Sequence, residues 1–138
     1  MKVRIKWQKN VAFEAKTDSG HSLLMDGSTD AGGENLGPRP METVLAGTGA
    51  CSAIDVILIL KKARQNVTDC YVDLEADRAA TDPKVFTRIH FHFVVTGKAL
   101  DHAKVGRAIA LSADVYCSAS AMLAKTASIT HDFEIIEG

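Results

Sequence analysis

The chain has 138 residues, a length typical of one domain rather than two. Its 16 basic and 17 acidic residues leave a formal net charge of -1, and no stretch concentrates Lys and Arg as a nucleic-acid groove requires. A hydrophobic content of 46% is enough to build a core without disulfide staples. Composition therefore argues against nucleic acid as a partner.

The N-terminal region predicts three short β-strands followed by a long loop. Residues 2–7 alternate basic and apolar side chains, residues 11–15 repeat the alternation, and residues 22–25 follow a turn. Residues 26–39 are rich in Gly and polar residues, which is typical of a loop. Because the first residues alternate rather than form an apolar run, we expect no secretory signal and a cytoplasmic location.

A single long helix is predicted over residues 40–65. Pro40 suits the first helical turn, and the segment is apolar on nearly every side until Lys61. It approaches the length of a membrane span, but Asp55 lies within it and no second such segment follows, so a buried core helix is the better interpretation. One subunit of this size cannot cover such a helix alone, which predicts a dimer.

The second half predicts two long strands, two helical segments and a final strand, over residues of about 70–77, 85–96, 101–115, 118–124 and 129–136. The resulting order is βββ-α-ββ-α-α-β, in which antiparallel strands and helices are separated. The fold class predicted is therefore α+β, in a single domain over residues 1–138.

The three cysteines, Cys51, Cys70 and Cys117, are too few and too widely spaced for a disulfide framework or a CxxC zinc site. Cys51 lies in a stretch of Gly and Ala within the long helix, where either an inert core thiol or a reactive thiol is possible. Cys117 lies between two predicted helices, where the positive end of a helix dipole favours thiolate, although a small residue at a helix junction is the alternative. Cys70 has the parity of an apolar strand face and is interpreted as structural.

Four further polar residues are candidates for a functional site. His90 and His92 share one strand face, a spacing that can hold a metal, but no acidic residue or cysteine alternates with them, so solvent-facing or interface histidines are favoured and no metal site is predicted. Arg39 and Glu42 are opposite charges beside the start of the long helix. They could serve a nearby thiol or belong to ordinary loop and helix-end solvation.

Two motifs resemble the OsmC/Ohr family. The first is Gly37-Pro38-Arg39-Pro40-Met41-Glu42, leading through small residues to Cys51, and the second is Tyr116-Cys117-Ser118-Ala119-Ser120-Ala121-Met122-Leu123. Their spacing, the strand order and the chain length also match, so the resemblance covers essentially the whole chain. The Cys-Ser-x-Ser-Ala-Met-Leu ending is similar to that of the YhfA-like branch.

The resemblance implies an OsmC-like fold, with antiparallel sheets around a long central helix in an intertwined homodimer. It also implies that Cys51 attacks an organic hydroperoxide and that Cys117 resolves the sulfenic acid as a disulfide. A dithiol, in the family often a lipoylated protein, would then reduce that disulfide. No cofactor, metal, nucleic acid or membrane partner is expected.

This sequence departs from the family pattern at two places. Met41 occupies the position of a family Glu, and Glu42 follows one residue later. The early loop around residues 14–21 lacks the Arg that the family has there, and Arg39 is the candidate to replace it. Three functions stay open. The first is a thiol peroxidase with Cys51, Cys117, Glu42 and Arg39 as catalytic residues.

The second is a non-catalytic dimer that binds an apolar or acyl molecule in a cleft lined by Val44, Thr48 and Ile54. The third is a redox sensor that forms the Cys51–Cys117 disulfide without rapid turnover.

Overall fold

A computed structural model describes all of residues 1–138. The chain separates into two compact units, residues 1–46 and residues 47–138, and the boundary falls inside the long helix α1 (Pro40–Lys62). Each unit is described by itself. One continuous helix belongs to both units, and the single domain over residues 1–138 stays a prediction.

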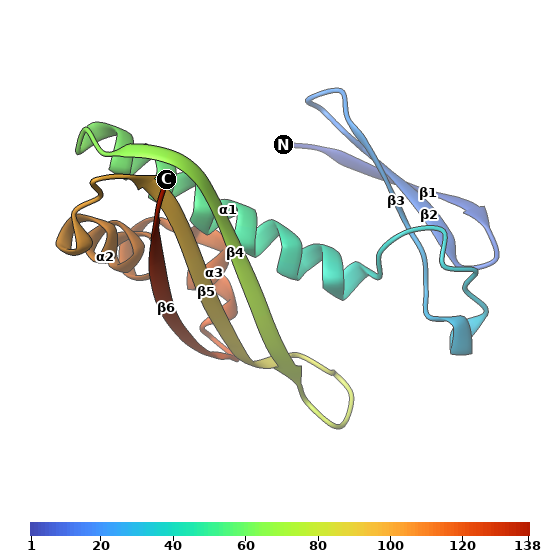
Figure 1. Cartoon of the computed structure of the whole chain (residues 1–138). Coiled ribbons are helices and arrows are strands. Elements are labelled where there is room, and N and C mark those ends of the chain that lie inside the picture. Colours follow the sequence, from blue (N-terminus) through green and yellow to red (C-terminus); the bar gives the residue numbers. More distant parts are fainter. The chain divides into compact units, whose positions relative to one another are not determined.

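The first unit contains a three-stranded antiparallel sheet in the order β1-β2-β3 (Figure 1). Its strands are β1 (Val3–Lys9), β2 (Ala12–Thr17) and β3 (Ser22–Met25). The alternation read from the sequence is thus confirmed as a meander. The apolar side chains of β1 are more than half exposed, at 52%, 53% and 61% for Val3, Ile5 and Trp7. This apolar sheet face therefore lacks a cover in the single chain.

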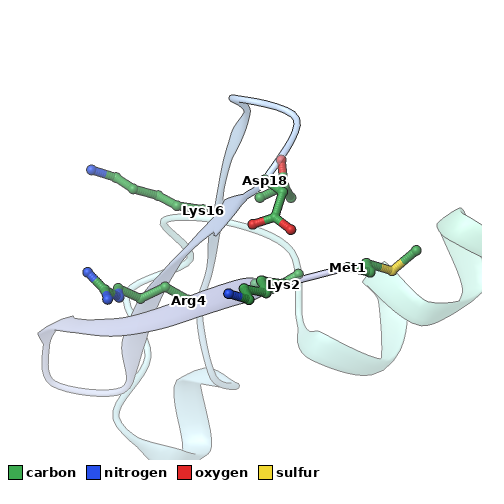
Figure 2. A pocket seen from close by; sticks show the side chains of 7 residues that line it. Met1, Lys2, Arg4, Lys16 and Asp18 are labelled. Carbon is green, nitrogen blue, oxygen red and sulfur yellow. The ribbon is translucent and has the colours of Figure 1, made fainter.

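The side chains of β1 that alternate with these apolar residues are basic. Arg4 pairs across the strands with Lys16, and together with Lys2 these side chains line a cavity of about 640 Å³ that also includes Asp18 (Figure 2). The linear sequence does not reveal this cluster, because pairing between strands creates it. No cysteine lines this cavity, and all three cysteines lie in the second unit.

The loop over residues 26–39 is ordered by one buried carboxylate. Asp26 is 2% exposed, and its Oδ2 accepts the backbone N–H groups of Glu34 at 2.9 Å and Leu36 at 3.2 Å. These hydrogen bonds hold the pKa of Asp26 below its usual value, and the one from Glu34 has the largest effect. A short 3-10 turn, η1 (Thr29–Ala31), lies within the same segment. The loop is therefore folded back on its own anchor.

The second unit contains a three-stranded mixed sheet in the order β4-β5-β6 (Figure 1). The strands β4 (Asn66–Arg78) and β5 (Phe86–Lys98) are antiparallel, whereas β5 and β6 (Ser128–Glu137) are parallel. The expectation of antiparallel sheets is wrong at this pair. A helical connection carries the chain back along the sheet before β6 begins, so β6 enters in the same direction as β5.

That connection consists of α2 (His102–Leu111), the π-helical turn η2 (Ser112–Tyr116) and α3 (Ser118–Leu123). The predicted helix over residues 101–115 is thus two elements. α2 begins at Asp101, whose carboxylate accepts the N–H of Lys104 at 3.1 Å. The predicted end of the long helix at residue 65 is also corrected: α1 ends at Lys62, and Arg64 has a φ of 57°, a left-handed conformation typical of helix ends.

The core of the second unit lies on one face of its sheet. The buried members of β5 and α2 on this side are Ile89, Phe91, Phe93, Val95, Val105, Ala108 and Ile109. The ring of Phe133 on β6 lies 4.9 Å from the His102 ring, which joins the start of α2 to the sheet. Overall, the protein is a mixed α+β fold with two sheets and a long helix.

Helix α1 is only partly covered by its own chain. Val56 and Leu60 are fully buried, whereas Val44, Ile54 and Leu58 are 43%, 59% and 54% exposed. By length and composition α1 is the one helix able to cross a membrane, a test that the core helix of a globular protein also passes. The expectation of a helix covered on every side is therefore not met within one chain.

Candidate functional site

The fold brings Cys117 against the part of α1 that carries Cys51. The Sγ of Cys117 donates to the backbone carbonyl of Thr48 at 4.0 Å, and Thr48 lies one helical turn before Cys51. Cys117 is 2% exposed, whereas Cys51 is half-buried, and both are free thiols. A half-buried thiol thus lies close to a buried one.

The surroundings of Cys117 favour its protonated form. Burial raises the pKa of the Cys117 thiol, and the neighbouring Cys51 raises it further. As the N-cap of α3, Cys117 also accepts the backbone N–H of Ser120 at 3.4 Å, which acts in the opposite direction. The expectation that the helix end favours the thiolate is not met, because desolvation of the Cys117 thiol outweighs its hydrogen bonds with Ser120.

Two buried serines link the segments that carry the cysteines. The Oγ atoms of Ser52 and Ser112 lie 2.9 Å apart, and the Ser112 hydroxyl also lies 3.4 Å from Oδ2 of Asp55. Ser52 directly follows Cys51, and the backbone carbonyl of Ser112 accepts the N–H of Cys117 at 2.9 Å. The sequence interpretation did not select either serine. The available signal was a hydroxyl among apolar positions on a buried helix face.

Arg39 and Glu42 are used within their own segment at the start of α1. The carboxylate of Glu42 accepts the backbone N–H of Arg39 at 2.9 Å, as a capping side chain does. The guanidinium of Arg39 donates to Oδ1 of Asn35 and to the carbonyl of Gly37, each at 3.1 Å. Both residues precede the boundary between the units, and a catalytic role for them stays a prediction.

In the folded sheet, His90 and His92 have an acidic neighbour that the sequence pattern does not show. Asp132 on β6 lies across from both rings, with its Oδ1 3.1 Å from Nε2 of His90 and 2.6 Å from Nδ1 of His92. An acidic neighbour therefore exists in the tertiary structure although none alternates with the histidines in sequence. The side chains of the protein form no group of three or more His, Cys, Asp or Glu arranged to hold a metal ion.

Cys70 is half-buried on β4, and burial raises the pKa of its thiol. It lies at the edge of an apolar cavity of about 250 Å³ whose other lining residues come from α1, namely Ala53, Ile54, Ile57 and Leu58. This position agrees with its interpretation as a structural thiol, because desolvation opposes formation of the reactive thiolate.

A larger cavity opens between α1 and η2, next to the serine pair. Its volume is about 370 Å³, and its lining residues are Asp55, Leu58, Ile59, Lys62, Leu111 and Tyr116. Tyr116 directly precedes Cys117, and Asp55 lies one turn beyond Cys51 on α1. Of the residues expected to line a cleft, Ile54 lines the cavity beside Cys70, whereas Thr48 is only 1% exposed. A cleft formed by Val44, Thr48 and Ile54 together stays a prediction.

Comparison with protein families agrees with this geometry. A family model described as OsmC-like protein matches residues 32–132, which include both cysteines and most of the fold. The chain belongs to the OsmC-like family.

Other proteins of this kind span the chain almost end to end. The protein YhfA of Escherichia coli strain K12 is 46% identical over 136 residues, covering 99% of this chain and 98% of YhfA. Among solved structures, a hypothetical protein of Aquifex aeolicus VF5 is 28% identical with a TM-score of 0.88, over 99% of this chain and 96% of its own. The organic hydroperoxide resistance protein OsmC of Legionella pneumophila, 20% identical with a TM-score of 0.72 over 97% of each chain, shares the OsmC-like fold.

Proposed function

We propose that this protein is a cytoplasmic thiol peroxidase that reduces organic hydroperoxides. The observation that carries the proposal is the placement of Cys117 against the turn of α1 that leads to Cys51, although the two lie far apart in sequence. Membership of a family with a relative named for organic hydroperoxide resistance supports the same chemistry.

In the proposed reaction, the Cys51 thiolate attacks a peroxide oxygen. An S–O bond forms, the O–O bond breaks, and the alkoxide leaves and takes up a proton to become an alcohol. The Cys117 sulfur then attacks the sulfenic acid, the S–O bond breaks, and water leaves as the disulfide forms. An external dithiol, for example on a lipoylated protein, restores both thiols by exchange.

The half-buried position of Cys51 suits this assignment of roles. A peroxide can reach Cys51 more readily than Cys117, which is almost fully buried. The adjacent cavity of about 370 Å³ has Leu58, Ile59 and Leu111 among its lining residues, and these would accept the organic substituent of the hydroperoxide. We therefore expect organic hydroperoxides to react faster than hydrogen peroxide.

We also propose that a second copy of the chain covers the exposed apolar surfaces. On α1 these are formed by Val44, Ile54 and Leu58, and on β1 by Val3, Ile5 and Trp7. Exposed large apolar side chains grouped on one element are typical of an interface. Sedimentation or light scattering of the purified protein would then give the mass of a homodimer, and a monomer at micromolar concentration would contradict it.

The test of the activity uses three matched cysteine variants, Cys51→Ser, Cys117→Ser and Cys70→Ser. We expect Cys51→Ser to abolish consumption of cumene hydroperoxide, Cys117→Ser to stop after a single oxidation of Cys51, and Cys70→Ser to retain turnover. Peptide mass spectrometry would identify the disulfide. Unchanged peroxide consumption by Cys51→Ser would rule the peroxidase out.

The same cavity gives a second candidate function, a dimer that binds an acyl or other apolar molecule without turnover. A volume of about 370 Å³ with Leu58, Ile59 and Leu111 among its lining residues suits an apolar group. Thiols that stay reduced in peroxide, together with a bound molecule in native mass spectrometry, would favour this candidate.

A further inference from the structure

Ser52 and Ser112 form a buried hydrogen-bonded pair where η2 meets α1. Their Oγ atoms are 2.9 Å apart, and the two residues are 2% and 0% exposed. The Ser112 hydroxyl also lies 3.1 Å from the carbonyl oxygen of Ser52. A buried hydroxyl is costly unless it is hydrogen-bonded, so these contacts favour one register of η2 along α1.

Either Oγ can be the donor between the two serines. In one consistent arrangement, the Ser112 hydroxyl donates its proton to the Ser52 carbonyl or to Oδ2 of Asp55, at 3.1 Å and 3.4 Å, and the Ser52 hydroxyl donates to the Ser112 oxygen. In this arrangement, contact between the two segments satisfies both hydroxyls.

Each serine is coupled to one of the two site cysteines. Ser52 is the next residue after Cys51 on α1. The carbonyl of Ser112 accepts the N–H of Cys117 at 2.9 Å, which closes the π-helical turn. The side chain of Ser112 thus fixes η2 to α1, and its main chain fixes Cys117 to η2. π-helical turns of this kind are frequent at functional sites.

Disulfide formation demands accurate placement of the two sulfurs. The S–S bond requires a separation of about 2.05 Å and a defined dihedral angle. At present the Cys117 sulfur is engaged by the Ser120 N–H at 3.4 Å and the Thr48 carbonyl at 4.0 Å. It must leave these partners while its backbone stays close to Cys51.

We propose that Ser52 and Ser112 are positioning residues that hold η2 against α1 during the attack of Cys117 on an oxidised Cys51 sulfur. The inference rests on the proposed function for the natural oxidant, but the attack itself can be measured without a peroxide. The serines touch neither reacting sulfur through their hydroxyls and act through the backbone of η2.

The test uses dithiobis(nitrobenzoate) on protein that carries Cys70→Ser. The reagent labels the more exposed Cys51 and releases one nitrothiobenzoate. The Cys117 thiolate then attacks the Cys51 sulfur, an S–S bond forms between the cysteines, and the bond to the second nitrothiobenzoate breaks. The two coloured releases separate labelling from intramolecular attack.

We expect Ser112→Ala and Ser52→Ala each to slow the second release by about tenfold or more, because loss of placement is costly for a positioned reaction. Labelling of Cys51 should be unchanged, and the double variant should be no slower than either single variant, since both remove one interaction. Ser118→Ala, an exposed serine beside Cys117, is the matched control and should react like the parent protein.

An unchanged second release in both serine variants, even with lowered stability, would overturn the positioning role and leave only packing. Absence of a second release from the parent protein would overturn it too. Circular dichroism checks folding, and Ser52→Ala keeps the test available if Ser112→Ala fails to fold. Failure of the peroxidase proposal would show separately, as a Cys51 that peroxide does not oxidise while the second release proceeds.

Discussion

The sulfur of Cys117 lies 4.0 Å from the carbonyl oxygen of Thr48, in the helical turn that leads to Cys51. Helix α1 therefore carries one half-buried thiol, and the second thiol comes from the junction between η2 and α3. The pairing depends on the π-helical turn, because η2 sets where α3 and its N-cap begin. A substitution that shifts this turn should change the rate of disulfide formation between Cys51 and Cys117 even where the fold is kept.

The raised pKa of Cys117 predicts how its attack depends on pH. Since burial keeps the thiol protonated near neutrality, only a minor fraction is thiolate, and that fraction grows about tenfold for each pH unit below the pKa. We expect the second nitrothiobenzoate release to accelerate between about pH 7 and pH 8.5 by that slope. A rate independent of pH over this range would mean that Cys117 is already a thiolate.

Two leucines on α1 form a matched pair for stability. Leu60 is 0% exposed and Leu58 is 54% exposed. Leu60→Ala should lower the free energy of unfolding by about 2–5 kcal/mol, through lost burial and an internal cavity. In urea denaturation this loss should not depend on protein concentration.

Leu58→Ala should behave differently if a second copy covers α1. Its destabilisation should then depend on protein concentration, because the lost contact is between subunits. Leu58→Asp should shift the protein towards the monomer in sedimentation. An Asp variant that keeps the mass of the parent protein would place the interface elsewhere.

The glycines of α1 give opposite expectations. A Cβ at Gly49 would lie 2.7 Å from Cδ1 of Leu74, whereas a Cβ at Gly47 would meet nothing within 4 Å in the single chain. Gly47→Ala should raise the free energy of unfolding by about 1 kcal/mol through helix propensity. The free energy of unfolding of Gly49→Ala should be about 1–2 kcal/mol lower than that of Gly47→Ala, because the Leu74 side chain must move. Equal effects in urea denaturation would show that β4 accommodates the methyl group freely.

The histidines of β5 predict a pH-dependent stability. The hydrogen bond to Asp132 raises the pKa of His92, with smaller contributions from Asp132, Glu134 and Asp73, and His92 and then His90 lower the pKa of Asp132. Stability from His92 is complete below its unfolded pKa of about 6.5 and is lost as the pH rises through the higher folded value. Stability from Asp132 is present above about pH 3.9 and is lost on acidification through its lower folded value.

The cluster should therefore stabilise the protein most between about pH 4 and pH 6.5. His92→Gln should flatten the decline in unfolding free energy from about pH 6 to pH 8, as measured by urea titration at several pH values. His131→Gln, at an exposed histidine on β6, is the control. The same decline in His92→Gln as in the parent protein would contradict the assignment.

Local patterns in the sequence determined most elements of this protein. Alternation placed β1 to β6 within a few residues, and the apolar run after Pro40 gave α1. The cysteine motifs gave the OsmC-like resemblance, which the family match confirmed. These features are local because each depends on propensity and periodicity over a few consecutive residues.

Only the tertiary structure decided the contacts between segments that are distant in the chain. It made β5 and β6 parallel, gave His90 and His92 their shared Asp132, and joined Ser52 to Ser112. It also reversed the expected effect at Cys117, where burial outweighs the hydrogen bonds with Ser120. Desolvation and hydrogen bonding depend on which surfaces meet, and that information is not contained in any short stretch of sequence.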